Sequence, residues 1–282
     1  MLKTVISASR RTDLPAFYYD WLQNVLRSGE VEQKNPVYRG STYKVDLRPQ
    51  AVHSIVLWSK DLSKVAEEPG CLVDYSLYFQ YTVTGYSRVL EPNVPSYETT
   101  LGVLEKLLRR YDPRQFTIRF DPVLLSLQGE EAPIPGKPGT ARLKLFDRLC
   151  RDLKTLGMEG CRLTTSYIAL YSHVAKRLET NRFLYYDISE TLQIRFFTKL
   201  AEIAGRYGLA LYSCSSPILE NVPGISRGRC IDGYLLEALF GGKTSKAKDT
   251  GQRKTCGCTA SRDIGSYEQV CGHNCLYCYQ RT

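Results

Sequence analysis

Six short apolar runs alternate along this chain with stretches of helical periodicity, and this alternation restricts the possible folds more than any other feature. The runs are typical of buried strands and cover Thr4–Ser7, Ser54–Trp58, Leu77–Thr82, Phe116–Phe120, Cys161–Thr165 and Leu209–Tyr212. Strands that alternate with helices build a parallel sheet covered by helices, because each parallel crossover needs a long connection. The sequence therefore predicts an α/β fold of about six strand-helix units.

Residues that favour helix ends delimit four helices between these runs. Asp13 and Ser189 are residue types that cap helix starts, and Gly29 and Gly208 can end the helices that follow. Two further helices are predicted from Ser96 to Arg110 and from Thr140 to Leu156. No G-x-G-x-x-G follows the first apolar run, which argues against a dinucleotide-binding sheet. We therefore expect a partial or closed TIM-like barrel of parallel strands.

Composition favours one large folded body with a distinct tail. The chain has 282 residues, 43% of them hydrophobic, which is enough for a single sizeable core. We expect a barrel domain over residues 1–242, and a basic linker with a cysteine-rich tail over residues 243–282 that packs on the barrel. No apolar run approaches the roughly 18 residues of a membrane helix, and no secretion signal is evident at the start. These features predict a cytoplasmic protein without membrane contact.

Polar residues directly follow nearly every predicted strand. In a parallel barrel the carboxyl ends of the strands face one mouth, where functional residues gather. The candidates for catalysis or substrate contact are Arg10, Arg11, Asp13, Lys60, Arg119 and Asp121. Ser9, Arg10 and Thr82 are candidates for cofactor contact. The alternative is a structural network at these strand ends, in which Arg10 and Arg11 form ion pairs with Asp61 or Asp121.

The cysteines concentrate at the end of the chain. An intracellular chain keeps its thiols reduced, so metal ligation or redox chemistry is favoured over disulfides. Cys271, Cys275 and Cys278 have the spacing C-x-x-x-C-x-x-C, and we call them the C-terminal motif. Three thiolates can hold three irons of a four-iron four-sulfur cluster and leave the fourth iron open, whereas a zinc ion is the alternative.

A second cysteine set is predicted from position rather than from spacing. It comprises one residue at a strand end, one in a loop and two just before the C-terminal motif: Cys214, Cys230, Cys256 and Cys258. Four thiolates would suffice for a second cluster or a zinc ion. The alternative is that these four cysteines bind no metal.

Positive charge also concentrates near the tail. The formal net charge is +9, and basic residues crowd the approach to the C-terminal motif: Lys243, Lys246, Lys248, Arg253, Lys254 and Arg262. Such a field favours an anionic partner, either a small nucleotide-like or carboxylate substrate or a nucleic acid. A solvated basic linker is the structural alternative.

The pattern C-x-x-x-C-x-aromatic-C, with Tyr277 as the aromatic residue, resembles the signature of the radical S-adenosylmethionine enzymes. That resemblance implies a four-iron four-sulfur cluster, S-adenosylmethionine bound at its open iron, a partial barrel of six strand-helix units, and a reductant such as ferredoxin or flavodoxin. It makes Tyr277 and Tyr279 candidates for cofactor contact. In that superfamily the motif usually follows the first strand, whereas here it comes at the end of the sequence, as in a circular permutation or an independently evolved equivalent.

The whole chain also resembles a bacterial family called domain of unknown function 1848. The stretches that carry this resemblance are ISASRRTDLPAFY, VLWSKD, QYTVTGY, RFDPV and CGCTASRDIGSYEQVCGHNCLYCY. The family name implies no activity. We expect a radical S-adenosylmethionine-type enzyme that abstracts hydrogen from an anionic substrate. The alternatives are a nucleic-acid-binding, repair or modification protein with an iron-sulfur cluster, and a non-catalytic iron-sulfur or zinc protein.

Overall fold

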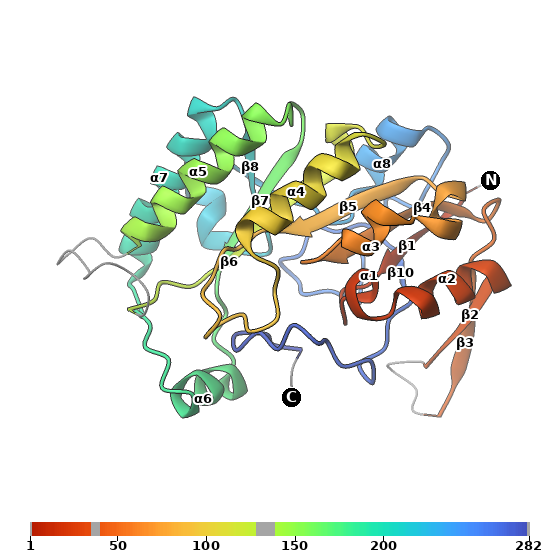
Figure 1. The fold of residues 1–282 in the computed structure, drawn as a ribbon, viewed down its shortest axis with the longest axis horizontal. Coiled ribbons are helices and arrows are strands. Elements are labelled where there is room, and N and C mark those ends of the chain that lie inside the picture. The colour runs from red at the N-terminus through yellow and green to blue at the C-terminus, as the bar shows by residue number, and fades with distance from the viewer. Residues whose placement is uncertain (1, 35–39, 128–138, 281–282) are drawn as a thin grey trace. The chain divides into compact units, whose positions relative to one another are not determined.

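The computed structural model describes residues 2–34, 40–127 and 139–280, which form two compact units (Figure 1). Unit 1 comprises Met1–Tyr81, Thr100–Tyr111 and Arg229–Gly272. Unit 2 comprises Thr82–Thr99, Asp112–Gly228 and His273–Thr282. Each unit is described by itself below. The predicted division of the chain between residues 242 and 243 stays a prediction.

Unit 1 contains a row of parallel strands in the order β10-β1-β4-β5. These strands are β1 (Thr4–Ala8), β4 (Val52–Ser59), β5 (Leu77–Thr82, whose last residue belongs to unit 2) and β10 (Arg262–Asp263). All but one of the eight residues of β4 are buried, as expected of a parallel strand covered on both faces. A separate antiparallel hairpin pairs β2 (Glu30–Lys34) with β3 (Thr42–Asp46).

The helices of unit 1 are α1 (Leu14–Phe17), α2 (Tyr19–Ser28), α3 (Ser63–Glu67), most of α4 (Tyr97–Leu108), α8 (Gly233–Phe240) and the 3-10 helix η1 (Gly70–Asp74). Two of them, α1 and α8, begin at an aspartate whose side chain caps the helix. The side chain of Asp13 caps α1, as predicted. The single helix predicted up to Gly29 is divided, because Tyr18 adopts a non-helical φ of -127° and ψ of 35°. Gly29 ends α2 at a φ of 76°, a conformation that glycine adopts without strain.

Unit 2 contains the second row of parallel strands, in the order β6-β7-β8-β9. They are β6 (Phe116–Val123), β7 (Arg162–Tyr167), β8 (Ala210–Ser213) and β9 (Ile225–Arg227). The helices are α5 (Thr140–Thr155), α6 (Ser172–Thr180) and α7 (Glu190–Arg206), with 3-10 helices η2 (Pro113–Gln115) and η3 (Pro217–Asn221). Figure 1 shows α5 and α7 side by side. Within the described residues, no helix has the length and apolar character needed to cross a membrane.

The predicted α/β class is confirmed, but the predicted TIM-like barrel is not. Each of the six predicted strands corresponds to an observed one. The strands β10 and β9 each have a single neighbouring strand, so the strand order does not return to its start and the sheet is not closed. Closure of a sheet depends on strand tilt and register, which an alternating pattern of strands and helices does not encode.

Candidate functional site

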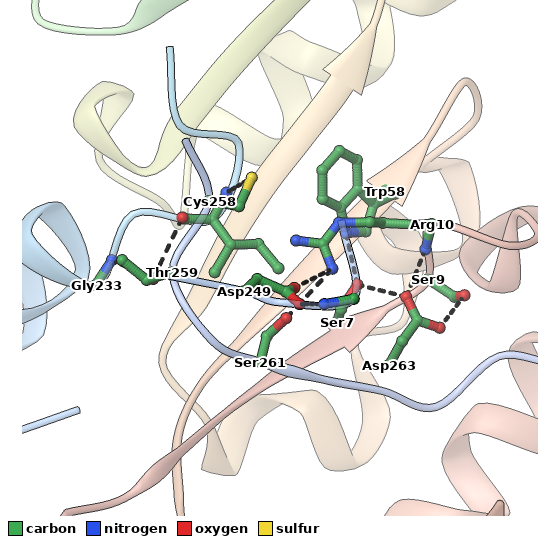
Figure 2. A network of polar contacts seen from close by, with 12 residues as sticks. Ser7, Ser9, Arg10, Trp58, Gly233, Asp249, Cys258, Thr259, Ser261 and Asp263 are labelled. Carbon is green, nitrogen blue, oxygen red and sulfur yellow. Dashed lines mark hydrogen bonds and ion pairs between the residues drawn. The ribbon is translucent and has the colours of Figure 1, made fainter. Parts of the chain in front are cut away.

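Asp263 ties the C-terminal part of unit 1 to the carboxyl end of β1. Its carboxylate accepts hydrogen bonds from the hydroxyl groups of Ser7 at 2.7 Å and Ser9 at 2.5 Å (Figure 2). The backbone nitrogen of Arg10 donates to the same carboxylate at 2.8 Å. Asp263 also pairs with Ser7 in the register of β10 and β1. Ser9, a predicted cofactor-contact residue, is therefore held by the chain's own tail.

The guanidinium of Arg10 lies inside this network. Its Nη1 donates to Asp249 at 3.5 Å and to Ser261 at 3.3 Å, and its Cζ is 5.4 Å from the ring centre of Trp58. Its Nη2 is buried and has no hydrogen-bond partner. Figure 2 shows Cys258 on the side of this guanidinium away from Asp263. Burial lowers the pKa of Arg10, but neighbouring thiols and carboxylates raise it, and the net shift is upward.

Three of the four cysteines of the second set meet in unit 1, and we call Cys230, Cys256 and Cys258 the thiol cluster. Cys258 is 2% exposed, and the backbone nitrogen of Ile231 donates to its Sγ at 3.4 Å. A hydrogen bond with Cys230 lowers the pKa of Cys258, whereas a hydrogen bond with Cys256 and burial raise it, for a net upward shift. The fourth member, Cys214, follows β8 in unit 2 and donates its backbone nitrogen to Thr165.

The other candidates of unit 1 hold backbone groups in place. The carboxylate of Asp13 accepts hydrogen bonds from the backbone nitrogen of Ala16 at 3.0 Å, from Ser59 at 2.7 Å and from the backbone nitrogen of Lys60 at 2.9 Å. Asp13 therefore fixes the start of α1 to the end of β4.

Arg11 contacts the chain's tail rather than an acidic side chain of a neighbouring strand. Its Nη1 donates to the carbonyl of Gly265 at 2.8 Å, and its Cζ lies 5.1 Å from the ring centre of Tyr267. The predicted structural network thus exists, but with other partners. Arg10 pairs with Asp249, and the side chain of Asp61 caps the backbone nitrogen of Ser63.

In unit 2, the predicted residues of β6 form a buried ion pair. Arg119 contacts Asp121, and their side chains are 9% and 12% exposed. Ser166 of the adjacent strand β7 donates its hydroxyl to Asp121. Thr82 precedes Val83, whose backbone nitrogen donates to the carbonyl of Arg119 at 2.9 Å. These contacts position a charged pair near the carboxyl end of β6.

The C-terminal motif is anchored at its last two cysteines. Cys271 belongs to unit 1, whereas Cys275 and Cys278 belong to unit 2. The backbone nitrogen of Cys278 donates to the carbonyl of Cys275 at 3.2 Å, so a turn brings these two residues close together. The carbonyl of Cys278 accepts a hydrogen bond from the side chain of Arg177 at 2.8 Å. The backbone nitrogen of Leu276 donates to the carbonyl of Leu90 at 2.9 Å.

The aromatic residue of the motif has a partner of its own. Tyr277 is 7% exposed and donates its hydroxyl to Glu91, which also accepts a hydrogen bond from Thr84 at 2.7 Å. Burial raises the pKa of Tyr277 well above its ordinary value, so this hydroxyl remains a donor. Tyr279 is 48% exposed, and its carbonyl lies 3.2 Å from Nε2 of His173. Of the two tyrosines, Tyr279 is the more accessible to a cofactor.

Two acidic residues that organise these sites were missed by sequence reasoning. Asp263 accepts a hydrogen bond from Ser9, which follows β1, and Glu91 accepts one from Tyr277, the aromatic residue of the C-terminal motif. Each is a single carboxylate in a segment without clear periodicity, so no spacing distinguishes it from a surface acid.

Neither metal site is preformed in the structure. Across residues 2–34, 40–127 and 139–280, no group of three or more His, Cys, Asp or Glu side chains is arranged so that it could hold a metal ion. A metal bound at the thiol cluster would have to replace the hydrogen bonds that Cys258 shares with Cys230 and Cys256. The cluster on Cys271, Cys275 and Cys278 and the metal on the second cysteine set therefore stay predictions.

A family model matches nearly the whole chain. This model, described as "Domain of unknown function (DUF1848)", covers residues 5–280. No curated protein and no solved structure matches the chain. The match carries no residue roles, so any chemistry must be argued from the side chains themselves.

Proposed function

Because the chain belongs to the DUF1848 family, whose description names no activity, we propose its function from the C-terminal motif. We propose that Cys271, Cys275 and Cys278 hold a four-iron four-sulfur cluster with one open iron, and that the chain is a radical S-adenosylmethionine-type enzyme. The observation that carries this proposal is the spacing C-x-x-x-C-x-x-C with Tyr277 before the last cysteine. When bound, the cluster would supply the electron for reductive cleavage of S-adenosylmethionine and hydrogen abstraction from the substrate.

The local fold of the motif supports this assignment. The turn from Cys275 to Cys278 brings the backbones of these two residues together, and Asn274 before it has a positive φ of 55°. Arg177 and Leu90 hold the backbone of the turn, so the two thiols are presented from a fixed loop. Buried Tyr277 further anchors the loop through Glu91. A loop whose backbone is already fixed loses less entropy when its side chains take up a cluster.

Positive charge supports an anionic substrate. A hollow of about 400 Å³ in unit 1 is lined by three cationic side chains, those of Lys3, Lys248 and Arg262, and by one acidic side chain, that of Asp249. Hydroxyl groups line the same hollow, from Thr4, Thr244, Ser245, Thr250 and Ser261. Cations and hydroxyl donors together suit phosphate or carboxylate groups. A nucleic-acid substrate would bind with an affinity that falls steeply with salt, and a small anion would show a much weaker dependence.

The test is anaerobic preparation of the full chain with iron and sulfide, followed by metal and sulfide analysis. We expect a cluster whose electron paramagnetic resonance signal changes when S-adenosylmethionine is added, and slow cleavage of S-adenosylmethionine by the reduced protein. Cys275→Ala should lose the signal. The matched control is Cys71→Ala in η1, a half-buried cysteine outside both cysteine sets, which should keep it. Zinc without iron, or equal iron in Cys275→Ala, would refute the proposal.

A further inference from the structure

The hollow in unit 1 carries more positive than negative charge. Lys3, Lys248 and Arg262 line it, and Asp249 is the acid among its described lining residues. Asp249 already has a cation of its own, because its Oδ2 lies 3.5 Å from Nη1 of Arg10 and the two side chains are 13% and 15% exposed (Figure 2). Arg10 does not line the hollow, so the charge of Asp249 is balanced from outside the lining. The three lining cations therefore set the sign of the field in the hollow.

The three lining cations have no acidic partner. Across residues 2–34, 40–127 and 139–280, no carboxylate forms an ion pair with Lys3, Lys248 or Arg262. Nζ of Lys248 donates instead to the carbonyl of Lys254 at 2.6 Å, and Cζ of Arg262 lies 5.7 Å from the ring centre of Tyr43. All three lining cations belong to exposed residues, so a ligand can reach them. An anion in the hollow would thus gain cations that need not leave an acid.

Hydroxyl groups add neutral donors to the same lining. Oγ of Ser261 accepts a hydrogen bond from Nη1 of Arg10 at 3.3 Å, and Oγ of Ser245 accepts one from the backbone nitrogen of Ala247 at 3.3 Å. A hydroxyl group that accepts a hydrogen bond keeps its own hydrogen, so both serines can still donate to a ligand. Phosphate oxygens accept hydrogen bonds from cations and hydroxyl groups together. The lining therefore offers both kinds of donor that a phosphate group uses.

We propose that this hollow binds a phosphate monoester group, which narrows the anionic substrate of the proposed function to a phosphorylated compound. A phosphate monoester carries close to two negative charges at neutral pH, and three cations match that charge better than the single charge of a carboxylate. The volume of about 400 Å³ lies within the roughly 300–1,000 Å³ of ligand pockets, so the hollow also admits part of the compound beyond its phosphate. Binding of the phosphate follows from the charges of unit 1, and only its role in a substrate rests on the proposed function.

The phosphate held in the hollow is an anchoring group and not the group that reacts. Thr4 begins β1 and Ser261 directly precedes β10, so the hollow lies at the amino ends of these parallel strands. The segment that leads to Cys271 follows their carboxyl ends, where Nη1 of Arg11 donates to the carbonyl of Gly265 at 2.8 Å. The five residues of β1 rise about 3.3 Å each, so roughly 15 Å separates its two ends. The hollow thus binds a part of the substrate that lies away from Cys271.

The experiment is a calorimetric titration of the full chain, prepared without iron or S-adenosylmethionine, with three anions that share a phenyl ring. Phenyl phosphate is the monoester, methyl phenyl phosphate is a diester with one charge, and benzoate is the carboxylate. We expect one phenyl phosphate per chain, bound about 10-fold more tightly than either other anion, because it carries an additional charge beside the three cations. Failure of the proposed function would leave this result unchanged, since neither the cluster nor S-adenosylmethionine is present.

Variants of the full chain locate the binding. Lys248→Met and Arg262→Met should each weaken phenyl phosphate about 10-fold, the effect of losing one hydrogen bond from a charged donor. Lys254→Met is the matched control, because Lys254 is an exposed cation of the same segment that does not line the hollow, and its loss should change the affinity by less than about 2-fold. Circular dichroism shows whether each variant remains folded.

Four results would overturn the proposal. The first is absence of phenyl phosphate binding, and the second is an equal loss of affinity in Lys248→Met and Lys254→Met. The third is benzoate or the diester bound as tightly as phenyl phosphate. The fourth is single-stranded DNA that binds more tightly than phenyl phosphate and loses affinity in Lys248→Met, which would assign the hollow to nucleic acid.

Discussion

The backbone nitrogen of Arg10 donates a hydrogen bond at 2.8 Å to the carboxylate of Asp263, although 253 positions separate the two residues. The strand that carries Asp263, β10, is only two residues long and offers little backbone pairing of its own. The side chain of Asp263 therefore contributes much of what fixes this segment to β1. Asp249 and Ser261, which hold the guanidinium of Arg10, lie in the same segment.

Replacing Asp263 should destabilise unit 1. Asp263→Ala leaves the hydroxyl groups of Ser7 and Ser9 and the backbone nitrogen of Arg10 without their charged acceptor. Hydrogen bonds to charged groups contribute about 1.5–3 kcal/mol each and are not additive, so we expect a loss of about 2–4 kcal/mol in the free energy of unfolding. Denaturant titration followed by circular dichroism measures it.

The matched control for Asp263 is an acid of the same segment. Glu268 pairs with Lys34, and their side chains are 71% and 74% exposed. Because exposed ion pairs contribute little, Glu268→Ala should change the free energy of unfolding by less than about 1 kcal/mol. Equal effects of the two substitutions would show that Asp263 does not organise the segment.

Asp13 was predicted as a site residue, but its contacts predict a structural effect. Asp13→Ala removes the acceptor of Ala16, Ser59 and Lys60, so we expect a loss of about 2–4 kcal/mol of stability. Ser189→Ala is the comparison, because Ser189 caps α7 through a single hydrogen bond of 3.5 Å and should cost about 0.5–1 kcal/mol. Thermal and denaturant unfolding of both variants would decide. A stable Asp13→Ala protein would return Asp13 to the list of candidate functional residues.

The sequence predicted the long buried elements well for a physical reason. Strands β4 and β6 have eight residues each, so a run of apolar side chains is visible without any knowledge of the fold. The two residues of β10, Arg262 and Asp263, are polar and too few to show a period. Helix α8 was also missed, although Asp232 is a capping residue directly before its apolar residues, and this signal could have been used.

Contacts of the candidate site were less predictable than its residue types. The spacing of Cys271, Cys275 and Cys278 is local and can be read directly, and the turn between the last two follows from the same few residues. The partners of Arg10 lie more than 230 positions away, at Asp249 and Asp263, and depend on the register of β10 against β1. No local pattern encodes that register, so the structural alternative named Asp61 or Asp121 as partners, whereas Arg10 pairs with Asp249.

Tyr277→Phe keeps the aromatic ring of the C-terminal motif and removes only its hydroxyl, so it tests the hydrogen bond to Glu91. The substitution deprives the buried carboxylate of Glu91 of one donor and leaves it with Thr84, so we expect a loss of about 1–3 kcal/mol in the free energy of unfolding. Tyr267→Phe is the control, since Tyr267 is 65% exposed and should change stability by less than about 0.5 kcal/mol. Two similar denaturation curves for Tyr277→Phe and the parent protein would contradict a role for this hydroxyl bond.

Alkaline pH should destabilise unit 2 through Cys161, the residue that precedes β7. Burial raises the pKa of Cys161 from 9.0 to about 12, so the folded protein keeps a proton that the unfolded chain releases. The unfolded state binds fewer protons between these two values, and the free energy of unfolding must therefore fall as pH rises from 9 toward 12. One such group accounts for at most about 1.4 kcal/mol per pH unit.

The measurement for Cys161 is the slope of the free energy of unfolding against pH between pH 8 and 11, by denaturant titration. Cys161→Ala should show a shallower decline than the parent protein, because it has no proton to release at this position. Leu163→Val is the matched control: Leu163 is also buried, on β7, and its substitution leaves a small cavity without removing a titrating group. It should lower stability by about 0.5–1.5 kcal/mol and keep the parent slope. Parallel declines in the parent and in Cys161→Ala would show that the buried tyrosines, whose pKa values burial also raises, account for the alkaline loss.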